Sequence, residues 1–311
     1  MCRQGGPEAG ARAGEILSCP ANPGPGAGAV HNKAEGDPID RIRAKADVPD
    51  RLRPLISDRW SELGNVLLIK FPDELIPHKK AVARAYAEEL GAKAVLEDKG
   101  VEGELREPVV DVLYGTDTIT THLENGVRFR FDAARIMFSK GNTGERIRVP
   151  ELVRDGEVVA DMFAGIGYFT VPIAVHARPS RIIAAEKNPL SAMFLRENIA
   201  LNKVRDGLVT VHEGDCLGLP EGVADRVLMG LIPSAAPFLE KAVRILSPKG
   251  GFLHFHETAR EKEVPHVPFG KVRDAARAAG LGARLVGHRV VKSYAPCVLH
   301  VVVDVELGPG L

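Results

Sequence analysis

VADMFAGIGYF, residues Val159–Phe169, is the stretch that decides the fold of this chain. Its apolar run ends in Asp161, a tight turn with Gly165 and Gly167 follows, and Tyr168–Val175 has the pattern of a helix start. A strand, a glycine turn and a helix N-terminus in this order let backbone N–H groups approach a nucleotide-like ligand. The motif alone is a weak signal, because short glycine motifs also occur as plain turns.

The next segment, RIIAAEKNP, strengthens the interpretation because it predicts a second strand that ends in Glu186. An acidic side chain at this point of a doubly wound fold accepts hydrogen bonds from a ribose. The GxGxxG pattern of dinucleotide sites is absent, so the pattern favours S-adenosylmethionine as the ligand. The alternative for Glu186 is a solvated position beside a helix N-cap, and the strand register favours the ligand role.

Strands and helices alternate regularly through the rest of the chain, which predicts a parallel sheet with helices on both faces. The predicted strands are Val158–Met162, Arg181–Glu186, Leu208–Glu213, Asp225–Gly230 and Gly251–Glu257. Helical stretches such as Leu190–Leu201 and Ala236–Leu246 separate them. Ala283–Val290 and Val298–Leu307 follow each other without a helix, so we expect an antiparallel final pair. The predicted fold class is α/β, a doubly wound, mostly parallel, seven-stranded Rossmann-like methyltransferase sheet with a smaller N-terminal α+β domain.

The composition shifts along the chain divide it into three parts. Residues 1–36 are rich in Gly, Ala and Pro and are predicted to be a flexible extension. Residues 37–134 are predicted to form the small α+β domain, with a helix over Asp73–Leu90 and a hairpin in THLENGVRFRFD around Asn125-Gly126. Residues 135–311 then form the domain that binds S-adenosylmethionine.

The overall composition is that of a soluble globular protein, with 45% hydrophobic and 26% charged residues in 311. The 41 basic and 41 acidic residues give a formal net charge of +0, so nucleic-acid binding requires local clusters of charge. Four cysteines have no metal or disulfide spacing, which favours a reducing compartment: Cys2, Cys19, Cys216 and Cys297. Without a signal sequence or a membrane-length apolar run, we expect a cytoplasmic protein.

The ends of the other strands supply further candidates for the ligand site. Backbone groups around Phe163 and Ala164 are expected near the methionine portion of the ligand. The third strand ends in EGDC, where Asp215 either accepts from the adenine amino group beside the Cys216 backbone or caps the next helix. The fourth strand ends in MGLIPS, where DNA and RNA amino-methyltransferases carry an acidic or amide residue followed by two prolines. This chain has Gly230-Leu231-Ile232-Pro233-Ser234 there, with Pro233 and Ser234 as candidates for the substrate site. The missing amide or acid disfavours methylation of an exocyclic amine.

A family resemblance follows from five blocks in order: RIMFSKGNTGER, DMFAGIGYF, AAEKNP, EGDC and MGLIPS. Together they resemble the tRNA wybutosine-synthesising aminocarboxypropyltransferases, in particular the archaeal ones, from about residue 37 to the C-terminus. The related tRNA guanosine N1-methyltransferases typically have FSPR in the first block and Asn-Leu-Pro or Asn-Pro-Pro in the last. Both blocks of this chain differ from that sister family.

The resemblance implies that Ser139 and Arg146 join Glu186, Asp215 and Cys216 in the S-adenosylmethionine site. Ser139 can act as an N-cap, and Arg146 can hold a carboxylate through paired N–H groups. The alternative for Arg146 is a surface ion pair with Glu145 or Glu151. Two weaker candidates for the substrate site are Lys140 and Asn142.

The implied reaction transfers the 3-amino-3-carboxypropyl group to the tricyclic guanine-derived base 3′ of the anticodon in phenylalanine tRNA. Which carbon of the sulfonium is attacked depends on its orientation, because the leaving group must lie in line with the nucleophile. The protein then needs neither a nucleophile nor a metal, and Glu145 is a weak candidate for assisting proton loss. His254 and His256 share a strand face, but two histidines without a third ligand favour a structural role over a metal site.

Contacts to tRNA are expected from the small domain, whose basic side chains neutralise phosphates without reading sequence. The candidates are Arg41, Arg43, Lys79 and Lys80. Interleaved aspartates leave a solvated charged face as the alternative. Three other functions stay open: a methyltransferase on the same nucleotide, a non-catalytic tRNA-binding protein of this fold, and a small-molecule methyltransferase.

Overall fold

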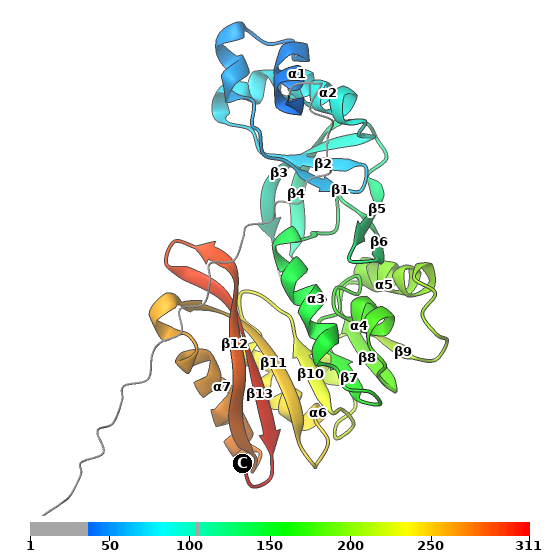
Figure 1. The fold of residues 1–311 in the computed structure, drawn as a ribbon, viewed down its shortest axis with the longest axis vertical. Helices are drawn as coiled ribbons and strands as arrows, with labels where there is room; N and C mark the ends of the chain where they lie inside the picture. The colour runs from blue at the N-terminus through cyan, green and yellow to red at the C-terminus, as the bar shows by residue number, and fades with distance from the viewer. Residues whose placement is uncertain (1–36, 104–105) are drawn as a thin grey trace, which may run out of the picture. The chain divides into compact units, whose positions relative to one another are not determined.

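The computed structural model describes residues 37–103 and 106–311 (Figure 1). The predicted extension over residues 1–36, with Cys2 and Cys19, lies outside the described residues. The helices of the described ranges are α1 (Pro38–Lys45), α2 (Lys79–Leu90), α3 (Thr143–Leu152), α4 (Thr170–His176), α5 (Pro189–Leu201), α6 (Leu239–Ile245) and α7 (His266–Ala278). The first six strands are β1 (Ser61–Leu63), β2 (Val66–Ile69), β3 (Ala94–Glu102), β4 (Glu107–Tyr114), β5 (Ile119–Glu124) and β6 (Val127–Asp132). The later strands are β7 (Val158–Asp161), β8 (Arg181–Glu186), β9 (Val209–Glu213), β10 (Arg226–Met229), β11 (Gly251–Arg260), β12 (Gly282–Ala295) and β13 (Val298–Gly308).

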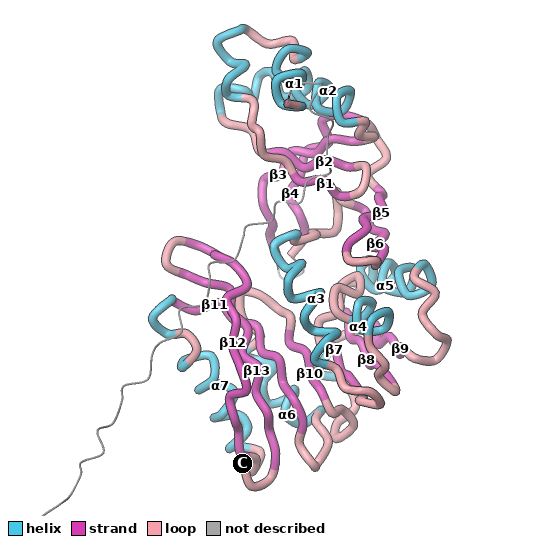
Figure 2. Tube along the Cα trace, viewed as in Figure 1, coloured by secondary structure: helices cyan, strands magenta, loops and turns pink. Residues whose placement is uncertain are grey.

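The large sheet has seven strands in the order β12-β13-β11-β10-β7-β8-β9 (Figure 2). Strands β11, β10, β7, β8 and β9 pair in parallel, whereas β13 is antiparallel to both β11 and β12. The predicted fold class and the antiparallel final pair are therefore confirmed. The chain leaves β7 toward β9 on one side and returns to β10 on the other. The carboxyl ends of β7 and β10 therefore form a switch point, where doubly wound sheets bind their ligands.

Alternate residues of the central strands pack on opposite faces of this sheet. On one face, Ala160 and Val227 belong to an apolar cluster with residues of α6 and α7. On the other face, Val159 and Leu228 pack with residues of α3 and α4. Both faces of the parallel strands are thus buried, as strands without polar alternation predict. The burial fixes the register that brings the strand ends to one edge.

The N-terminal part contains a four-stranded sheet in the order β1-β2-β3-β4, and α1 and α2 share an apolar cluster with β2 and β3. The helix predicted over Asp73–Leu90 is wrong in its first third. Residues Asp73–His78 form a 3-10 helix, and the α-helix begins only at Lys79. Pro77 explains the difference, because proline lacks an N–H and its ring disfavours the α conformation in the preceding residue.

The predicted hairpin is confirmed as β5 and β6, joined by Asn125 and Gly126 with φ of 47° and 76°. Two positive φ values identify the tight turn that Asn-Gly sequences favour. The amide of Asn198 on α5 accepts from the Arg130 N–H at 2.7 Å and donates to the Arg130 carbonyl at 3.2 Å. The hairpin is thus hydrogen-bonded to α5, a helix that packs on the large sheet. The predicted domain boundary at residue 134 stays a prediction.

The other predicted strands of the large sheet agree with the structure to within a few residues. Among the residues described, no helix is long and apolar enough to cross a membrane.

Candidate active site

A cavity of about 250 Å³ opens at the carboxyl edge of the large sheet. It lies at the switch point, because the loops after β7, β8, β9 and β10 all contribute to its lining. Eight of the residues predicted for the site line it: Ser139, Asn142, Arg146, Phe163, Gly165, Glu186, Asp215 and Cys216. The structure therefore brings together residues from four strand ends and from the segment that precedes α3.

The turn after β7 requires glycine at two positions. Gly165 has φ of +57°, and a Cβ there would lie 2.5 Å from Cε2 of Tyr168. Gly167 has φ of +98°, and a Cβ there would lie 2.5 Å from Cγ2 of Val171. Positive φ and the lack of space both exclude larger residues. The backbone of this turn therefore lies directly against the side chains of Tyr168 and Val171.

Glu186, at the end of β8, links this turn to the next loop. Its Oε2 accepts from the Gly165 N–H at 2.7 Å, and its Oε1 accepts from the Asn188 N–H at 2.8 Å. The Lys187 N–H also bonds to this carboxylate. A carboxylate has about four lone-pair sites, so Glu186 keeps acceptor capacity, and its side chain lines the cavity. Burial raises the pKa of Glu186, while the backbone N–H groups favour its charged form. This geometry suits a carboxylate that accepts from two hydroxyl groups.

Asp161, the last residue of β7, holds the glycine turn through hydrogen bonds from residues on both sides of it. Its side chain is fully buried, and its Oδ2 accepts from the Thr170 hydroxyl at 2.8 Å. Burial raises the pKa of Asp161 to about 6, against the hydrogen bonds from Thr170 and the Phe163 N–H, which lower it. Asp161 thus joins the strand end to the start of α4 and is not a lining residue of the cavity.

Asp215 caps the short 3-10 helix after β9 and also lines the cavity. Its Oδ1 accepts from the Leu217 N–H at 3.0 Å, and Lys187 lies 3.8 Å from its other oxygen. The capping role and a ligand role are therefore compatible, because the second oxygen retains acceptor capacity. Beside it, burial raises the pKa of the Cys216 thiol to about 12, so the thiol stays protonated.

Arg146 is buried beside the cavity, and its ion-pair partner differs from the alternatives considered above. Its guanidinium donates to both carboxylate oxygens of Glu124 on β5 and to the Ser139 carbonyl at 3.0 Å. The pair with Glu145 or Glu151 is thus wrong. Ser139 precedes a 3-10 helix without capping it through its side chain, and its hydroxyl accepts from Lys292 at 2.6 Å.

Glu145, the weak catalytic candidate, lies away from the cavity lining. Its carboxylate is 1% exposed and is held by Arg148 at 2.8 Å and Arg289 at 3.5 Å. These two guanidinium partners occupy the acceptor positions of the carboxylate, which disfavours a role in proton transfer.

Several other predicted residues also lie outside the lining of this cavity. Ser234 donates to Glu257 at 2.8 Å, and Pro233 follows a cis peptide bond. Arg41 pairs with Glu89, Arg43 donates to the Ile56 carbonyl, and Lys79 pairs with Glu97 and Asp111. The remaining ones are Ala164, Gly167, Lys140 and Lys80.

Among the lining residues that the sequence did not predict are four polar side chains from outside the strand ends: Arg106, Lys292, Tyr294 and His300. Lys292 and His300 are cross-strand partners on β12 and β13. The available signal was the polar end of the final hairpin, KSYAP, which reaches the edge where parallel strands end. The residues next to KSYAP in the sequence contain no motif that would assign this turn to a ligand site.

A buried polar network begins at Arg226, the first residue of β10, and continues through side chains of β11 and β13. Arg226 donates to both oxygens of Glu157, at 2.7 and 3.0 Å, and to the Leu152 carbonyl at 2.6 Å. It also donates to Nε2 of His254, whose Nδ1 bonds to Asp304. Burial lowers the pKa of His254 and His256, and His256 pairs with His300 at 3.0 Å. In the described ranges these histidines join no group of three metal-ligating side chains.

The seven-stranded sheet and the cavity at its carboxyl edge define the class I fold of S-adenosylmethionine-dependent transferases. Two family models match the chain: the TYW2 N-terminal domain over residues 41–118 and the TRM5/TYW2 methyltransferase domain over residues 120–283. The chain belongs to the TRM5/TYW2 methyltransferase family.

Individual relatives agree with this assignment. The Pyrococcus horikoshii tRNA(Phe) (4-demethylwyosine(37)-C(7)) aminocarboxypropyltransferase is 40% identical over 84% of this chain and 93% of its own length. A crystal structure of P. horikoshii TYW2 in complex with MeSAdo matches 87% of this chain and 99% of its own, with 39% identity and a TM-score of 0.79. The tRNA (guanine(37)-N(1))-methyltransferase Trm5b of Pyrococcus abyssi is 34% identical over 86% of this chain and 80% of its own length.

Proposed function

We propose that this protein transfers the 3-amino-3-carboxypropyl group of S-adenosylmethionine to C7 of the 4-demethylwyosine base at the position 3′ of the anticodon in phenylalanine tRNA. The observation that carries the proposal is the 40% identity to the P. horikoshii aminocarboxypropyltransferase, which extends over both family domains. A cavity with a carboxylate at the end of β8 and a glycine turn after β7 supports the same function. The reaction takes place on tRNA, so we place the enzyme in the cytoplasm.

The lining residues fit S-adenosylmethionine, which is a substrate of this reaction. Glu186 has two oxygens with acceptor capacity for the ribose hydroxyls, and Asp215 has one for the adenine amino group. The sulfonium supplies the leaving group. The base forms a bond to the γ-carbon and loses its ring proton, while the C–S bond breaks and its electron pair stays on sulfur as methylthioadenosine. The protein's own contribution is to orient the two substrates.

The MGLIPS segment supports carbon-chain transfer over methylation of an exocyclic amine. Gly230, Leu231 and Ile232 line the cavity, whereas Ser234 is turned to Glu257 by a hydrogen bond of 2.8 Å. No polar side chain of this loop therefore faces the target base to accept a proton from nitrogen. An apolar wall suits a ring carbon as the nucleophile.

Isotope labelling tests the proposed function against methylation of the same nucleotide. We expect label from carboxyl-labelled S-adenosylmethionine to enter a tRNA that carries the 4-demethylwyosine base, and label from the methyl group to remain in methylthioadenosine. The measurement is radioactivity in purified tRNA from two parallel reactions. Entry of the methyl label alone would identify a methyltransferase and contradict the proposal.

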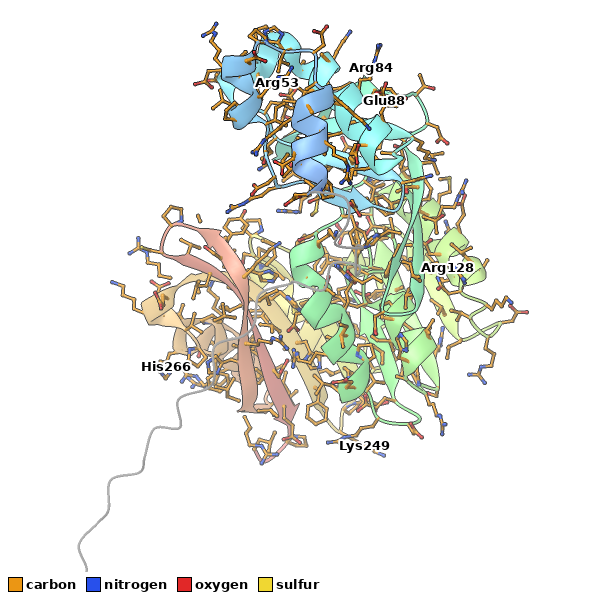
Figure 3. All side chains as sticks on the ribbon, turned by 45° about the horizontal axis from the view of Figure 1, so that its top comes forward. Arg53, Arg84, Glu88, Arg128, Lys249 and His266 are labelled. Atoms are coloured by element: carbon orange, nitrogen blue, oxygen red, sulfur yellow. The ribbon has the colours of Figure 1, made fainter. Side chains whose placement is uncertain are left out.

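The exposed face of α2 is the part of the small sheet domain that we propose for phosphate contacts. Lys80 and Arg84 are exposed and lie one helical turn apart. Figure 3 labels Arg84. Arg41, Arg43 and Lys79 already bond within the protein. We expect the double variant Lys80→Ala/Arg84→Ala to lower tRNA affinity about three- to tenfold. The slope of log K against log salt should fall by about one for each lost phosphate contact.

Filter binding across a salt series measures both quantities. Lys249→Ala is the matched control, because this exposed lysine lies two residues before β11, at the amino edge of the large sheet (Figure 3). Unchanged affinity and slope in the double variant would assign the face of α2 to solvent and leave the tRNA contacts elsewhere.

A further inference from the structure

Lys292 is fixed in the wall of the cavity by two neighbours. Its Nζ donates to the Ser139 hydroxyl at 2.6 Å. Its side chain also lies over the turn before α3, since a Cβ on Gly141 would come within 2.9 Å of Lys292 Cδ. The ammonium group is thus held at one place beside the cavity, although lysine side chains have many rotamers.

Two cationic side chains, those of Arg106 and Arg146, act on Lys292. Burial lowers the pKa of its ammonium group, and Arg106 and Arg146 lower it further. The Glu124 carboxylate neutralises the charge of Arg146, whereas Arg106 donates to the neutral carbonyl of Ile232 at 2.9 Å. Within residues 37–103 and 106–311, Lys292 has no ion pair with a carboxylate. This part of the cavity therefore has an excess of positive charge.

Other partly buried lysines of the chain have acidic partners. Lys241 pairs with Glu221 at 2.9 Å, and Lys79 pairs with Glu97 and Asp111, both at 2.8 Å. Buried ammonium groups need such partners, because desolvation of the charge is costly. Among the described residues, Lys292 has only a neutral hydroxyl group as its hydrogen-bond partner. A partly desolvated cation of this kind, in the wall of a cavity, indicates a site for an anion that comes with a ligand.

We propose that Lys292 binds the carboxylate of the amino-acid portion of S-adenosylmethionine and thereby determines which carbon of the sulfonium faces the base. This inference rests on the proposed function. The carboxylate is the one anionic group of that ligand, whereas Glu186 and Asp215 suit its hydroxyl and amino groups. The Ser139 hydroxyl accepts from Lys292 and keeps its own proton to donate to the same carboxylate.

Anchoring the carboxylate has a direct effect on the reaction. The amino-acid chain becomes fixed at both ends, at the sulfur by the nucleoside contacts and at the carboxylate by Lys292. The γ-carbon lies within that fixed chain, so its approach to the base no longer depends on free rotation. Lys292 acts here as a specificity-determining residue, without taking part in proton transfer.

Calorimetry with three ligands tests the assignment. The ligands are S-adenosylmethionine, its decarboxylated analogue and methylthioadenosine, each titrated into wild-type protein and Lys292→Met. We expect the variant to bind S-adenosylmethionine roughly ten- to hundredfold more weakly, as for a lost hydrogen bond between charged groups. Binding of the other two ligands should change less than twofold, because neither contains the carboxylate.

Two further variants separate this role from a structural one. Lys292→Arg keeps the positive charge and should retain most of the affinity for S-adenosylmethionine. Lys249→Met removes an exposed ammonium group at the opposite edge of the sheet and should leave all three affinities unchanged (Figure 3). Thermal melting verifies that Lys292→Met is folded, which we expect because the substitution removes a partly buried cation that lacks an acidic partner.

Equal affinity of wild type and Lys292→Met for S-adenosylmethionine would overturn the assignment. If instead the variant loses tRNA affinity and about one unit of salt slope, the anion is an RNA phosphate and the carboxylate assignment is wrong. Failure of the proposed function has a different signature. Wild-type protein would then transfer the methyl label to tRNA, or would not bind S-adenosylmethionine, whatever the variant does.

Discussion

Glu186→Ala is expected to weaken the binding of S-adenosylmethionine about ten- to hundredfold. The carboxylate occupies the end of β8, lines the cavity and retains acceptor capacity beyond its backbone hydrogen bonds. Hydrogen bonds to a charged group contribute about 1.5–3 kcal/mol each, so the loss of one or two such bonds gives this range. Methylthioadenosine should lose affinity by the same factor, because it contains the same ribose. Calorimetry measures both constants.

The same substitution also removes the acceptor for the Gly165 and Asn188 N–H groups, so a control must separate binding from folding. Thermal melting of the unliganded variant reports that structural contribution. Asp161→Asn is the matched comparison, since it changes a buried carboxylate under the same turn that does not line the cavity. A dissociation constant for Glu186→Ala equal to that of the wild type would refute the ribose assignment.

Arg226→Ala is expected to lower the free energy of unfolding by about 3–5 kcal/mol. The guanidinium is 2% exposed and bonds to Glu157, to His254 and to the Leu152 carbonyl. Removing it leaves the carboxylate of Glu157, itself 8% exposed, buried without its partner. An uncompensated buried charge costs far more than the net contribution of the original pair. Urea denaturation followed by circular dichroism measures the change.

Two variants make this stability prediction specific. Glu157→Gln combined with Arg226→Met removes both charges and should recover part of the loss, because no unpaired ion remains. Arg244→Ala is the exposed control, since this arginine of α6 is 50% exposed and pairs with Glu221 at the surface. Its cost should stay within about 0–1 kcal/mol. A loss for Arg226→Ala in that same range would show that the buried network adds nothing to stability.

The parts of the fold that sequence predicts well are those set by neighbouring residues. The glycine turn and β8 are such parts, because the positive φ values and the apolar runs are local properties. The hairpin turn at Asn125-Gly126 is another, since two adjacent residues decide it. The wrongly predicted helix start at Asp73 shows how a single residue can overrule a periodic pattern. Its apolar spacing suits a helix, but Pro77 removes a backbone donor and interrupts it.

The site was predictable only where its residues follow strand ends. Glu186 and Asp215 come directly after β8 and β9, so the topology alone brings them to one edge. Lys292 lies 153 positions from its partner Ser139, and no local pattern joins them. The alternative for Arg146, an ion pair with acidic neighbours on its own helix, is wrong because its partner Glu124 comes from another element. Adjacent residues of a helix do not face each other, which is why Glu145 was a poor choice.

The amide contacts between α5 and the hairpin have a consequence for the behaviour of the protein in concentrated solution. Asn198 and Asn202 bond to the N–H and carbonyl groups of Arg130 and Arg128, four contacts between 2.7 and 3.2 Å. These are the groups through which an open strand recruits a strand from another molecule. Helical side chains thus occupy the outer rim of β6 and close it to self-association, without a further strand being needed.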